Sequence, residues 1–464
     1  MTNSIVYTAE LPSFDSESGQ LTLTQHHLIS TPLSYLNSIS QDYTLLLQPP
    51  PTQPYQSEQQ DTDPSLAESP PRRKRRRRAP PSETSSPADW ALHREKQERR
   101  TTTDRETEQH HASISLGLEA AIDAVRQGWS GQKKKEDGWM GDVGPRVEWI
   151  EKREGDELSL VELARRFPPA ENAGQHLLRI EERESSVSLS HLFNRIVLNP
   201  SDNAFTMVEL REDDNVEHAR LARLLLPPSS GFLLFDFFSW SSPSSGIASL
   251  GAQVGGWDVV VIDPPWPNAS ATRSSSYETF DAYDLWKLDL PALLGDKPAL
   301  VAVWLTNKVK FRRLVTEKLF PAWHIKPGAE WYWVKIASET GEPVWPLDAK
   351  HRRPYEGLVL GYYVPPKTPV DLPNLPQNKI FLSTPMGHSR KPIVIDLLRP
   401  YLLMSSKPPN VLELFARTTL SGFSGEDPTS SPSPRGTYLA VSNEAVKFNV
   451  LDEEGSGVKG WIKP

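Results

Sequence analysis

One short stretch of the chain carries residue types suited to holding the amino group of a planar base. It runs from Trp257 to Asn268 with the sequence WDVVVIDPPWPN. Asp263 offers a carboxylate and Pro264 a carbonyl, so both can accept hydrogens from an exocyclic amino nitrogen. Two acceptors favour a more tetrahedral nitrogen as a bond forms to it, which activates a delocalised purine amine. The prolines fix φ and have no N–H, so this turn presents acceptors only.

The next residues of the stretch add rigidity and a flat apolar surface. Pro265 continues the rigid turn, and the indole of Trp266 can stack on a base, a contact worth roughly 1–3 kcal/mol. The alternative interpretation is a proline-rich turn that ends a strand and buries a tryptophan. Because these four residues arise together by chance in only about one chain in a hundred, we favour the functional interpretation.

A second group of polar residues lies where a helix is expected to begin. Gly387–Pro392 has the sequence GHSRKP and leads into the apolar run Ile393–Met404, with Ser389 able to cap a helix. Lys391 then lies near a helix N-terminus, where the dipole disfavours a cation. This placement indicates an anionic ligand, and the alternative is an exposed lysine of the first turn. Arg390 is a further candidate contact to a phosphate.

Two later apolar runs, Val411–Phe415 and Tyr438–Val441, are typical of buried strands and are followed by polar residues. A carboxylate at such a strand end can accept both hydroxyls of a ribose, as in dinucleotide-binding folds. A low-complexity insertion, residues 421–436, separates the two strands and leaves the geometry of a ribose site open. The polar residues presented here are Glu413, Arg417, Asn443 and Glu444.

Further polar side chains are candidates for contacts to a nucleic acid. Residues 267–284 form a polar stretch, typical of a loop that closes over a substrate. Residues 341–356 form a second polar loop, between the expected strands Glu330–Ile336 and Gly357–Tyr363, and its cations would attract phosphates. His351 is not expected to bind a metal, because no cluster of His or Cys accompanies it. The candidates are Asn268, Arg273, Tyr277, Lys335, His351, Arg352 and Arg353.

The elements that must position these residues indicate an α/β catalytic domain over residues 229–450. Besides the run before Asp263, Phe232–Phe238 and Ala299–Leu305 predict buried strands, and Phe311–Phe320 predicts a helix. In open α/β sheets, ligands bind at the carboxyl ends of strands, where the polar residues lie. Asp236 also ends a strand, either at a ligand or as a cap of the next turn.

Residues 87–228 are predicted to form a mainly helical accessory domain. Leu116–Trp129 carries apolar residues at helical spacing, and Val161–Phe167 and Gln175–Ile180 are further amphipathic pieces. Asp213-Asp214-Asn215 can cap a helix that runs to Leu226 and ends before two prolines.

Both ends of the chain are predicted to be tails, residues 1–86 and 451–464. The first is rich in Ser, Thr, Gln and Pro, which is typical of disorder. Its end carries Arg72–Arg78, with the sequence RRKRRRR. This run is typical of a nuclear-import signal and secondarily of a phosphate-binding arm, and the alternative is a solvated charged tract.

Composition sets further bounds on the function. The 464 residues carry a formal net charge of −8, and without the seven basic residues of Arg72–Arg78 the charge would be −15. A nucleic acid must therefore bind through a local basic surface. The chain contains no cysteine, so disulfides and thiolate zinc sites are excluded. No apolar run approaches the ~20 residues that span a bilayer, and no signal-peptide pattern opens the chain, so we expect an intracellular, nuclear protein.

Several motifs together carry a resemblance to a known family. DPPW after an apolar strand resembles the catalytic motif of amino-group methyltransferases. With HSRKP and LELFAR downstream, residues 228–450 resemble the eukaryotic adenine-N6 methyltransferase family, the MT-A70 (MTA-seventy) group. Within that group the resemblance points to the methyltransferase-like protein four branch.

The resemblance implies S-adenosylmethionine as the cofactor and a Rossmann-like domain in the permuted β-class order, in which the catalytic strand precedes the cofactor turn. It assigns Lys391 to the methionyl carboxylate, and it places Asp236 and Phe237 near the cofactor's adenine. The family usually has glycines in the cofactor turn and Gly-Asn-Glu after the last strand, where this chain has Ala416-Arg417 and Ser442-Asn443-Glu444. The implied cofactor contacts are Asp236, Phe237, Ile262, Lys391, Glu413, Arg417, Asn443 and Glu444.

We therefore predict methyl transfer to N6 of adenine in RNA, with a small-nuclear-RNA-like substrate and 2′-O-methyladenosine as a candidate target. The target base must be unpaired or flipped out. No metal and no membrane is expected, and the family works both as monomers and as heterodimers. The alternatives are a DNA adenine methyltransferase, a non-catalytic RNA-binding subunit and a protein-glutamine methyltransferase. The intact DPPW motif and cofactor turn argue against the non-catalytic subunit.

Overall fold

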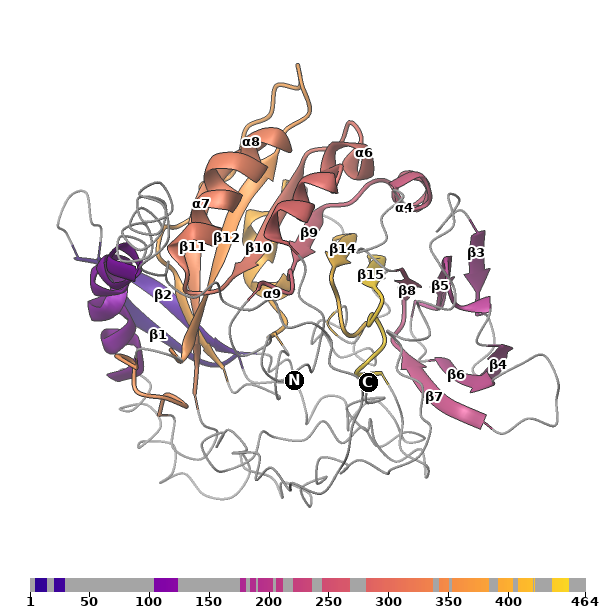
Figure 1. Ribbon diagram of the computed structural model, residues 1–464, viewed down its shortest axis with the longest axis horizontal. Helices are drawn as coiled ribbons and strands as arrows, with labels where there is room; N and C mark the ends of the chain where they lie inside the picture. Colours follow the sequence, from indigo (N-terminus) through magenta and orange to yellow (C-terminus); the bar gives the residue numbers. More distant parts are fainter. Residues whose placement is uncertain are drawn as a thin grey trace, which may run out of the picture.

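The described part of the chain centres on one large mixed sheet with helices on both faces (Figure 1). The computed structural model describes residues 5–14, 21–29, 104–123, 176–180, 184–188, 191–202, 206–211, 220–235, 244–267, 281–336, 342–349, 353–383, 391–403, 408–419, 421 and 436–449. The sheet has twelve strands in the order β1-β2-β13-β11-β12-β10-β9-β14-β15-β8-β5-β3.

Five parallel strands form the centre of this sheet. In spatial order they are β8 (Ser230–Leu234), β15 (Tyr438–Ser442), β14 (Val411–Leu414), β9 (Val259–Ile262) and β10 (Ala299–Leu305). Antiparallel β12 (Tyr355–Tyr363) lies beside β10, and β11 (Ile325–Lys335) then pairs antiparallel with β12. This mixed sheet, covered by helices, is consistent with the predicted α/β, Rossmann-like arrangement.

The central strands are apolar without a break because both of their faces are buried. In β9, Val259 and Val261 belong to one core, whereas Val260 and Ile262 belong to the core of the opposite face. Strands covered on both sides show such continuous apolar runs rather than an alternation. The predicted strands around Asp263 and in Ala299–Leu305 are confirmed.

Each face of the sheet has its own helices. On the face that we call the α4 face lie α4 (Ser244–Gln253), α6 (Leu290–Leu294) and a continuous helical segment made of α7 (Val309–Arg313), a π-helical turn (Leu314–Leu319) and α8 (Phe320–Ala322). On the α9 face lies α9 (Ile395–Leu398). It is shorter than the predicted helix Ile393–Met404, because Pro400 belongs to the 3₁₀ turn Arg399–Tyr401 that follows it. A 3₁₀ turn, Ala282–Lys287, precedes α6.

The connections diverge between β9 and β14. The chain leaves β9 toward β10 on one side, and it leaves β14 toward β15 on the other. Neighbouring parallel strands whose connections diverge form a topological switch point, and ligands of open α/β sheets bind outside the carboxyl ends at that point. The DPPW turn directly follows β9 there.

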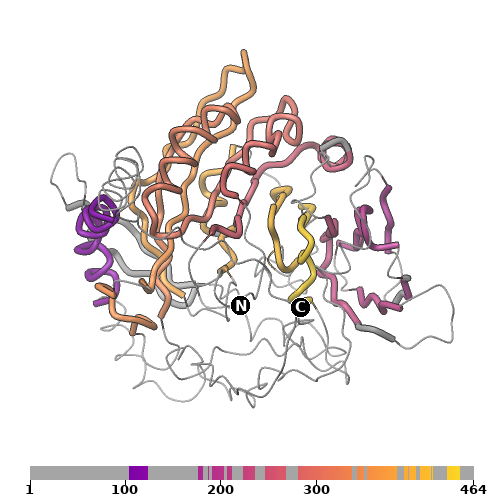
Figure 2. The backbone as a smooth tube through the Cα atoms, viewed as in Figure 1, coloured from indigo at the N-terminus to yellow at the C-terminus, as the bar shows by residue number. Residues whose placement is uncertain are grey.

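Residues 104–123 form a helix that packs on the large sheet, although some 200 residues separate it in sequence from the strands it covers (Figure 2). Leu118, Ala121 and Ile122 are buried against Val334 of β11 and Ile380 of β13 (Ile380–Ser383). This confirms the helix predicted at the start of Leu116–Trp129. The helix is one of those that cover the large sheet.

Two segments that were predicted to be helical are strands instead. Within Gln175–Ile180 lies β3 (His176–Arg179), which pairs with β5 (Arg195–Leu198). The segment that was expected to end as a helix at Leu226 contains β7 (Arg220–Leu226). Strand β7 pairs with β6 (Thr206–Arg211) in a three-stranded sheet with β4 (Glu184–Ser188). Over so few residues, the sequence pattern does not distinguish helical from alternating spacing. For residues 220–226, pairing with β6 makes the segment a strand.

Part of the N-terminal region that was expected to be disordered is also paired. Strands β1 (Ile5–Phe14) and β2 (Leu21–Ile29) form an antiparallel pair, and Leu28 of β2 joins Leu382 of β13. A composition averaged over 86 residues hid these local runs of strand-favouring residues. The basic run Arg72–Arg78, Val161–Phe167 and the C-terminal tail lie outside the described residues.

Candidate active site at the carboxyl edge of the sheet

The DPPW turn is fixed against the end of β14. The backbone N–H of Asp263 donates to the carbonyl of Leu414 at 3.2 Å, and Trp266 N–H donates to the carbonyl of Pro264 at 2.7 Å. A carbonyl oxygen has two lone pairs, so Pro264 retains one for an amino hydrogen. Pro265 continues this turn, half-buried. The Asp263 side chain is 15% exposed at the switch point.

Trp266 anchors this turn inside the protein. Its indole N–H donates to the carbonyl of Trp304 at 2.8 Å, and its ring packs on Phe311 with centroids 4.8 Å apart. The residue is only 4% exposed. In this structure the ring therefore holds the turn in place, and it is not an open surface for stacking on a base, as the sequence had led us to expect.

Four charged residues at the carboxyl edge lie on the α9 face of the sheet. Each is two positions from an apolar residue of that core: Asp263 from Val261, Lys335 from Trp333, Glu356 from Leu358, and Glu413 from Val411. Side chains two positions apart along a strand lie on the same face. The four charged side chains therefore lie together on the α9 face. Ile262 has the opposite parity and is fully buried on the α4 face, so its side chain does not reach this group.

Lys391 lies at the centre of the group, three residues before the cap of α9. Its ammonium is 3.1 Å from Asp263 Oδ1 and 2.9 Å from Glu356 Oε2, and it lies 5.4 Å from the ring of Trp304. Burial opposes its charge, but Asp263 and Glu356 outweigh burial and raise the pKa of Lys391 above its ordinary value. The sequence predicted an anionic ligand for Lys391, and in this structure two carboxylates of the protein itself lie beside its ammonium.

Glu356 was not predicted from the sequence, although its two-residue spacing from Leu358 could have revealed it. It binds Lys391, and it also forms a short ion pair with Lys335. Burial alone would raise the pKa of Glu356, but Lys335 and Lys391 lower it to about 2. Lys335 was predicted to grip the substrate, and its ammonium is instead committed to Glu356 beside the ring of Trp333.

Glu413 carries a carboxyl group of different character. No hydrogen bond or ion pair joins its side chain to another residue within the described ranges. Burial and the nearby charge of Asp263 raise the pKa of Glu413 to about 8. The positive charges of Lys391 and Arg417 lower this pKa, but by less than burial and Asp263 raise it.

The predicted ribose site contains a compact ion cluster. Arg417 Nε is 3.2 Å from Glu444 Oε2, and Lys447 Nζ is 2.6 Å from Glu444 Oε1. Burial raises the pKa of Glu444, but the two cations outweigh burial and leave the pKa below its ordinary value. Asn443, the first residue after β15, is half-buried beside this cluster. Lys447 was missed, although it lies one helical turn after Glu444.

The turns after β14 and β15 are joined to each other. Ser442 Oγ donates to the carbonyl of Ala416, and Phe448 N–H donates to the carbonyl of Arg417 at 3.0 Å. Phe415 has a φ of 61°, in the left-handed region that favours glycine. The turn after β14 therefore contains a non-glycine residue in a glycine-like backbone conformation.

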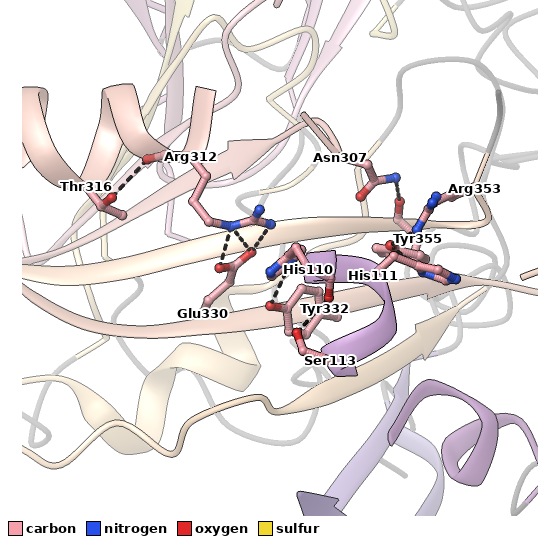
Figure 3. Close-up of polar contacts among 10 residues, drawn as sticks. All are labelled: His110, His111, Ser113, Asn307, Arg312, Thr316, Glu330, Tyr332, Arg353 and Tyr355. Atoms are coloured by element: carbon pink, nitrogen blue, oxygen red, sulfur yellow. Dashed lines mark hydrogen bonds and ion pairs between the residues drawn. The ribbon is translucent and has the colours of Figure 1, made fainter. Parts of the chain in front are cut away.

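Arg353 was predicted at the substrate surface, and the structure places it under helix 104–123 (Figure 3). Its side chain is 5% exposed, and its guanidinium donates to Glu108 at 2.7 Å and to the Tyr355 hydroxyl at 3.1 Å. In this structure the Arg353 guanidinium holds the helix, and its contact to a phosphate stays a prediction. Eight other predicted contacts lie outside the described residues: Asp236, Phe237, Asn268, Arg273, Tyr277, His351, Arg352 and Arg390.

The set of side chains at this edge suits a ligand that carries both signs of charge and hydroxyl groups. The Lys391 ammonium has three donors, and after Asp263 and Glu356 one remains for a ligand carboxylate. Glu413 has no hydrogen bond or ion pair to another described residue, and Glu444 can accept hydroxyl hydrogens. An amino-acid nucleoside such as S-adenosylmethionine combines these features. Within the described ranges, no cluster of His, Cys, Asp or Glu could hold a metal ion, and no helix is long and apolar enough to cross a membrane.

Comparison with known proteins adds a family to this geometry. The family model described as MT-A70 matches residues 257–425, the segment from before the DPPW turn to beyond the turn after β14. Similar proteins include "N(6)-adenine-specific methyltransferase METTL4" of Homo sapiens. It is 36% identical over 301 residues, which are 63% of this chain and 56% of that protein.

The names of two further relatives specify different nucleic acids, RNA and DNA. "N6-methyladenosine RNA methyltransferase MTA1" of Pyricularia oryzae is 35% identical over 179 residues, 36% of this chain and 45% of that protein. "DNA N6-methyl methyltransferase" of Caenorhabditis elegans is 31% identical over 256 residues, 55% of this chain and 64% of that protein. The chain thus spans between 45% and 64% of the length of the three relatives.

These matches confirm the resemblance to the MT-A70 group, and within it to the methyltransferase-like protein four branch. The matched segment contains β9, β14 and the residues that meet at Lys391. The MT-A70 model thus matches the segment of this chain, residues 257–425, in which these residues lie.

Proposed function

We propose that the protein is an S-adenosylmethionine-dependent methyltransferase that acts on N6 of adenine in a nucleic acid. One observation carries the proposal. The Asp263 carboxylate and the Pro264 carbonyl lie together at the switch point of the sheet, and Lys391 holds Asp263 in place at 3.1 Å. The names of the three relatives, each an N6 methyltransferase of adenine, RNA or DNA, support the same reaction.

The residues of the chain contribute orientation and electrostatics. Asp263 and Pro264 accept the two hydrogens of the amino group, which aims the nitrogen lone pair away from the turn. S-adenosylmethionine, when bound, supplies an electrophilic methyl group on a sulfonium. Lys391 would hold its carboxylate and Glu444 its ribose, with Arg417 and Asn443 beside them. Because Trp266 and the prolines fix the backbone, the acceptors need no reorganisation as the reaction proceeds.

We propose RNA as the nucleic acid, with a small-nuclear-RNA-like substrate and 2′-O-methyladenosine as a candidate target. The likeness to the METTL4 proteins supports this choice. The named relatives include both an RNA and a DNA enzyme, and the base is the same in both. The target base must leave its stack to reach Asp263, so unpaired adenines are the preferred sites. We further propose that the enzyme acts in the nucleus, alone or with a family-type partner subunit.

The experiment is methyl transfer from labelled S-adenosylmethionine to matched RNA and DNA oligonucleotides, with the wild-type protein and Asp263→Ala. We expect labelled N6-methyladenine in the RNA and at least a hundredfold slower transfer by the variant, as expected for loss of a key acceptor. Asp202→Ala is a matched control, because this carboxylate lies away from the switch point and binds Ser229.

The outcomes separate the alternatives. Label in DNA alone would replace RNA by DNA as the substrate. Cofactor binding without transfer to either oligonucleotide would indicate a missing partner or another acceptor, such as a glutamine amide. Absence of cofactor binding would overturn the enzyme and favour a non-catalytic RNA-binding subunit.

A further inference from the structure

Most of the charged residues described on the α9 face of the carboxyl edge are joined in ion pairs, and Glu413 is not. Asp263 and Glu356 share Lys391, Glu356 also holds Lys335, and Glu444 is held by Arg417 and Lys447. Glu413 has no hydrogen bond or ion pair among the described residues of this edge. An ionisable side chain that has no partner beside so many ion pairs indicates that a charged group of a ligand pairs with it.

The position of Glu413 places this carboxyl between the two halves of the site. It lies on β14 in register with Val261 of β9 on one side and Ala440 of β15 on the other, and neither neighbour carries a charge. The charges that act on it come from the turn after β9, Asp263, from the segment before α9, Lys391, and from the turn after β14, Arg417. Glu413 thus lies between the group that meets the base and the cluster that would meet the ribose.

A count of the paired residues gives the sign of the missing charge. The paired carboxylates are Asp263, Glu356 and Glu444, and the paired cations are Lys335, Lys391, Arg417 and Lys447. These seven described residues sum to one positive charge when Glu413 is neutral. An ionised Glu413 would cancel that excess and would then favour a ligand with a positive charge.

We propose that Glu413 makes the site prefer the positively charged methyl donor to its uncharged-sulfur product. The inference rests on the proposed function, because it takes S-adenosylmethionine as the donor. Donor and product share the nucleoside and the amino acid, and they differ by the methyl group and the sulfonium charge. A carboxylate close to the sulfonium therefore discriminates between them, and it limits inhibition by accumulated product.

The titration of Glu413 agrees with this role. Burial and Asp263 raise its pKa to about 8, so the carboxyl is largely protonated in the ligand-free site at neutral pH. The cationic donor favours the ionised form and so releases a proton as it binds, whereas the product lacks the sulfonium. The preference for the donor should therefore rise with pH and level off above about pH 8, the linkage expected for a group whose pKa falls on binding.

The test is calorimetric binding of S-adenosylmethionine, S-adenosylhomocysteine and sinefungin, whose amine places a cation where the sulfonium lies. The ratio of the product Kd to the donor Kd should fall on the order of tenfold in Glu413→Gln, the effect of one unit charge at short range. Sinefungin should follow the donor, because charge and not the methyl group is recognised. Glu317→Gln, which removes a 60%-exposed carboxylate on the α4 face, should leave the ratio unchanged.

A second measurement follows the proton. Titrations in buffers of different ionisation enthalpy at pH 7 should show proton release on donor binding to the wild type and none to Glu413→Gln. Glu413→Asp should retain part of the preference. If Glu413→Gln does not fold, the wild-type ratio between pH 7 and pH 9 decides, and a flat ratio overturns the role of Glu413.

Failure of the inference and failure of the proposed function give different results. Tight donor binding with a ratio that is unchanged in Glu413→Gln overturns the inference and leaves the methyltransferase intact. A wild-type protein that binds none of the three ligands overturns both.

Discussion

At the scale of single residues, Glu356 is the side chain on which the arrangement of the site depends most directly. It holds two lysines, and one of them, Lys391, holds Asp263. Its own side chain is 23% exposed, so solvent cannot replace it well as a partner of two ammonium groups. Its removal should therefore affect both stability and the orientation of Asp263.

We expect Glu356→Gln to lower the free energy of unfolding at neutral pH by about 3 kcal/mol, the low end for breaking a buried ion pair. The pKa of Glu356 is about 2 in the folded protein, below the ordinary value of about 4.3. Its contribution is therefore complete above that ordinary value and is lost as the pH falls toward 2.

Urea unfolding of wild type and variant at neutral and acidic pH measures this contribution. The difference between the two proteins should shrink as the pH falls. Glu317→Gln, whose exposed carboxylate lies 3.9 Å from Arg313, should cost less than about 1 kcal/mol. Equal losses in the two variants would contradict the role of Glu356.

Some charged residues of the site were predictable from the sequence, and others were not. Asp263, Lys391 and Glu444 stand out because each follows or precedes an apolar run, and Glu413 stands out because it interrupts one. Glu356 and the true role of Lys335 depend on which strand lies next to which, and β12 lies between β10 and β11 through an antiparallel insertion. The strand period fixes the face of each residue, but the order of the strands decides which charges meet.

At the scale of elements, the docking of helix 104–123 depends on uncharged histidines. His110 Nε2 is 3.3 Å from the Tyr332 hydroxyl, and His111 Nδ1 is 2.9 Å from the Tyr355 hydroxyl (Figure 3). Burial, Arg312, His111 and Arg353 lower the pKa of His110 to about 3. Burial and Arg353 lower the pKa of His111, against Glu108 and Asp348.

Acid should therefore loosen this helix. The unfolded pKa of histidine is about 6.5, so the stability that His110 contributes is complete above that pH and falls as the pH drops toward 3. At pH 5 the expected loss is up to about 2 kcal/mol. Hydrogen exchange of the amides of residues 104–123 at pH 7 and pH 5, corrected for intrinsic rates, measures it.

The control variants for this prediction separate His110 from general acid effects. His110→Gln should reduce the pH dependence of helix protection. His324→Asn removes an exposed histidine from a residue with a φ of 55°, where asparagine is tolerated, and should leave the dependence unchanged. Undiminished protection of the wild-type helix at pH 5 would contradict the prediction.

The elements themselves were predictable to different degrees. The central strands were foreseen because a buried parallel strand needs an uninterrupted apolar run. Strands β3 and β7 were taken for helices, since the runs HLLR and RLARLLL fit either period. The docking of helix 104–123 joins segments far apart in sequence, and nothing local in either segment specifies the other.

At the scale of the whole molecule, charge is unevenly distributed along the chain. The formal net charge is −8, although the seven residues of Arg72–Arg78 are all basic. An acidic protein that acts on nucleic acid needs its cations in a few places. The basic run is the densest of them, and we propose that it directs the protein to the nucleus.

Replacement of Arg72–Arg78 by serines should abolish nuclear accumulation of a fluorescent fusion, observed by microscopy. A matched change of Lys133-Lys134-Lys135 to serines, a shorter basic run outside the described residues, should leave it intact. Nuclear accumulation without the basic run would show that another segment or a partner directs the protein.

The boundary of the family match does not coincide with the boundary of the folded unit. The match covers residues 257–425, yet β8, β15 and helix 104–123 complete its sheet and cover one face. A fragment cut at the ends of the match would leave Tyr332, Tyr355 and Leu382, which are at most 2% exposed in the intact chain, open to water and to other copies. Expressed alone it should aggregate, so the smallest soluble piece with an intact Asp263 has to include the helix that begins some 150 residues earlier.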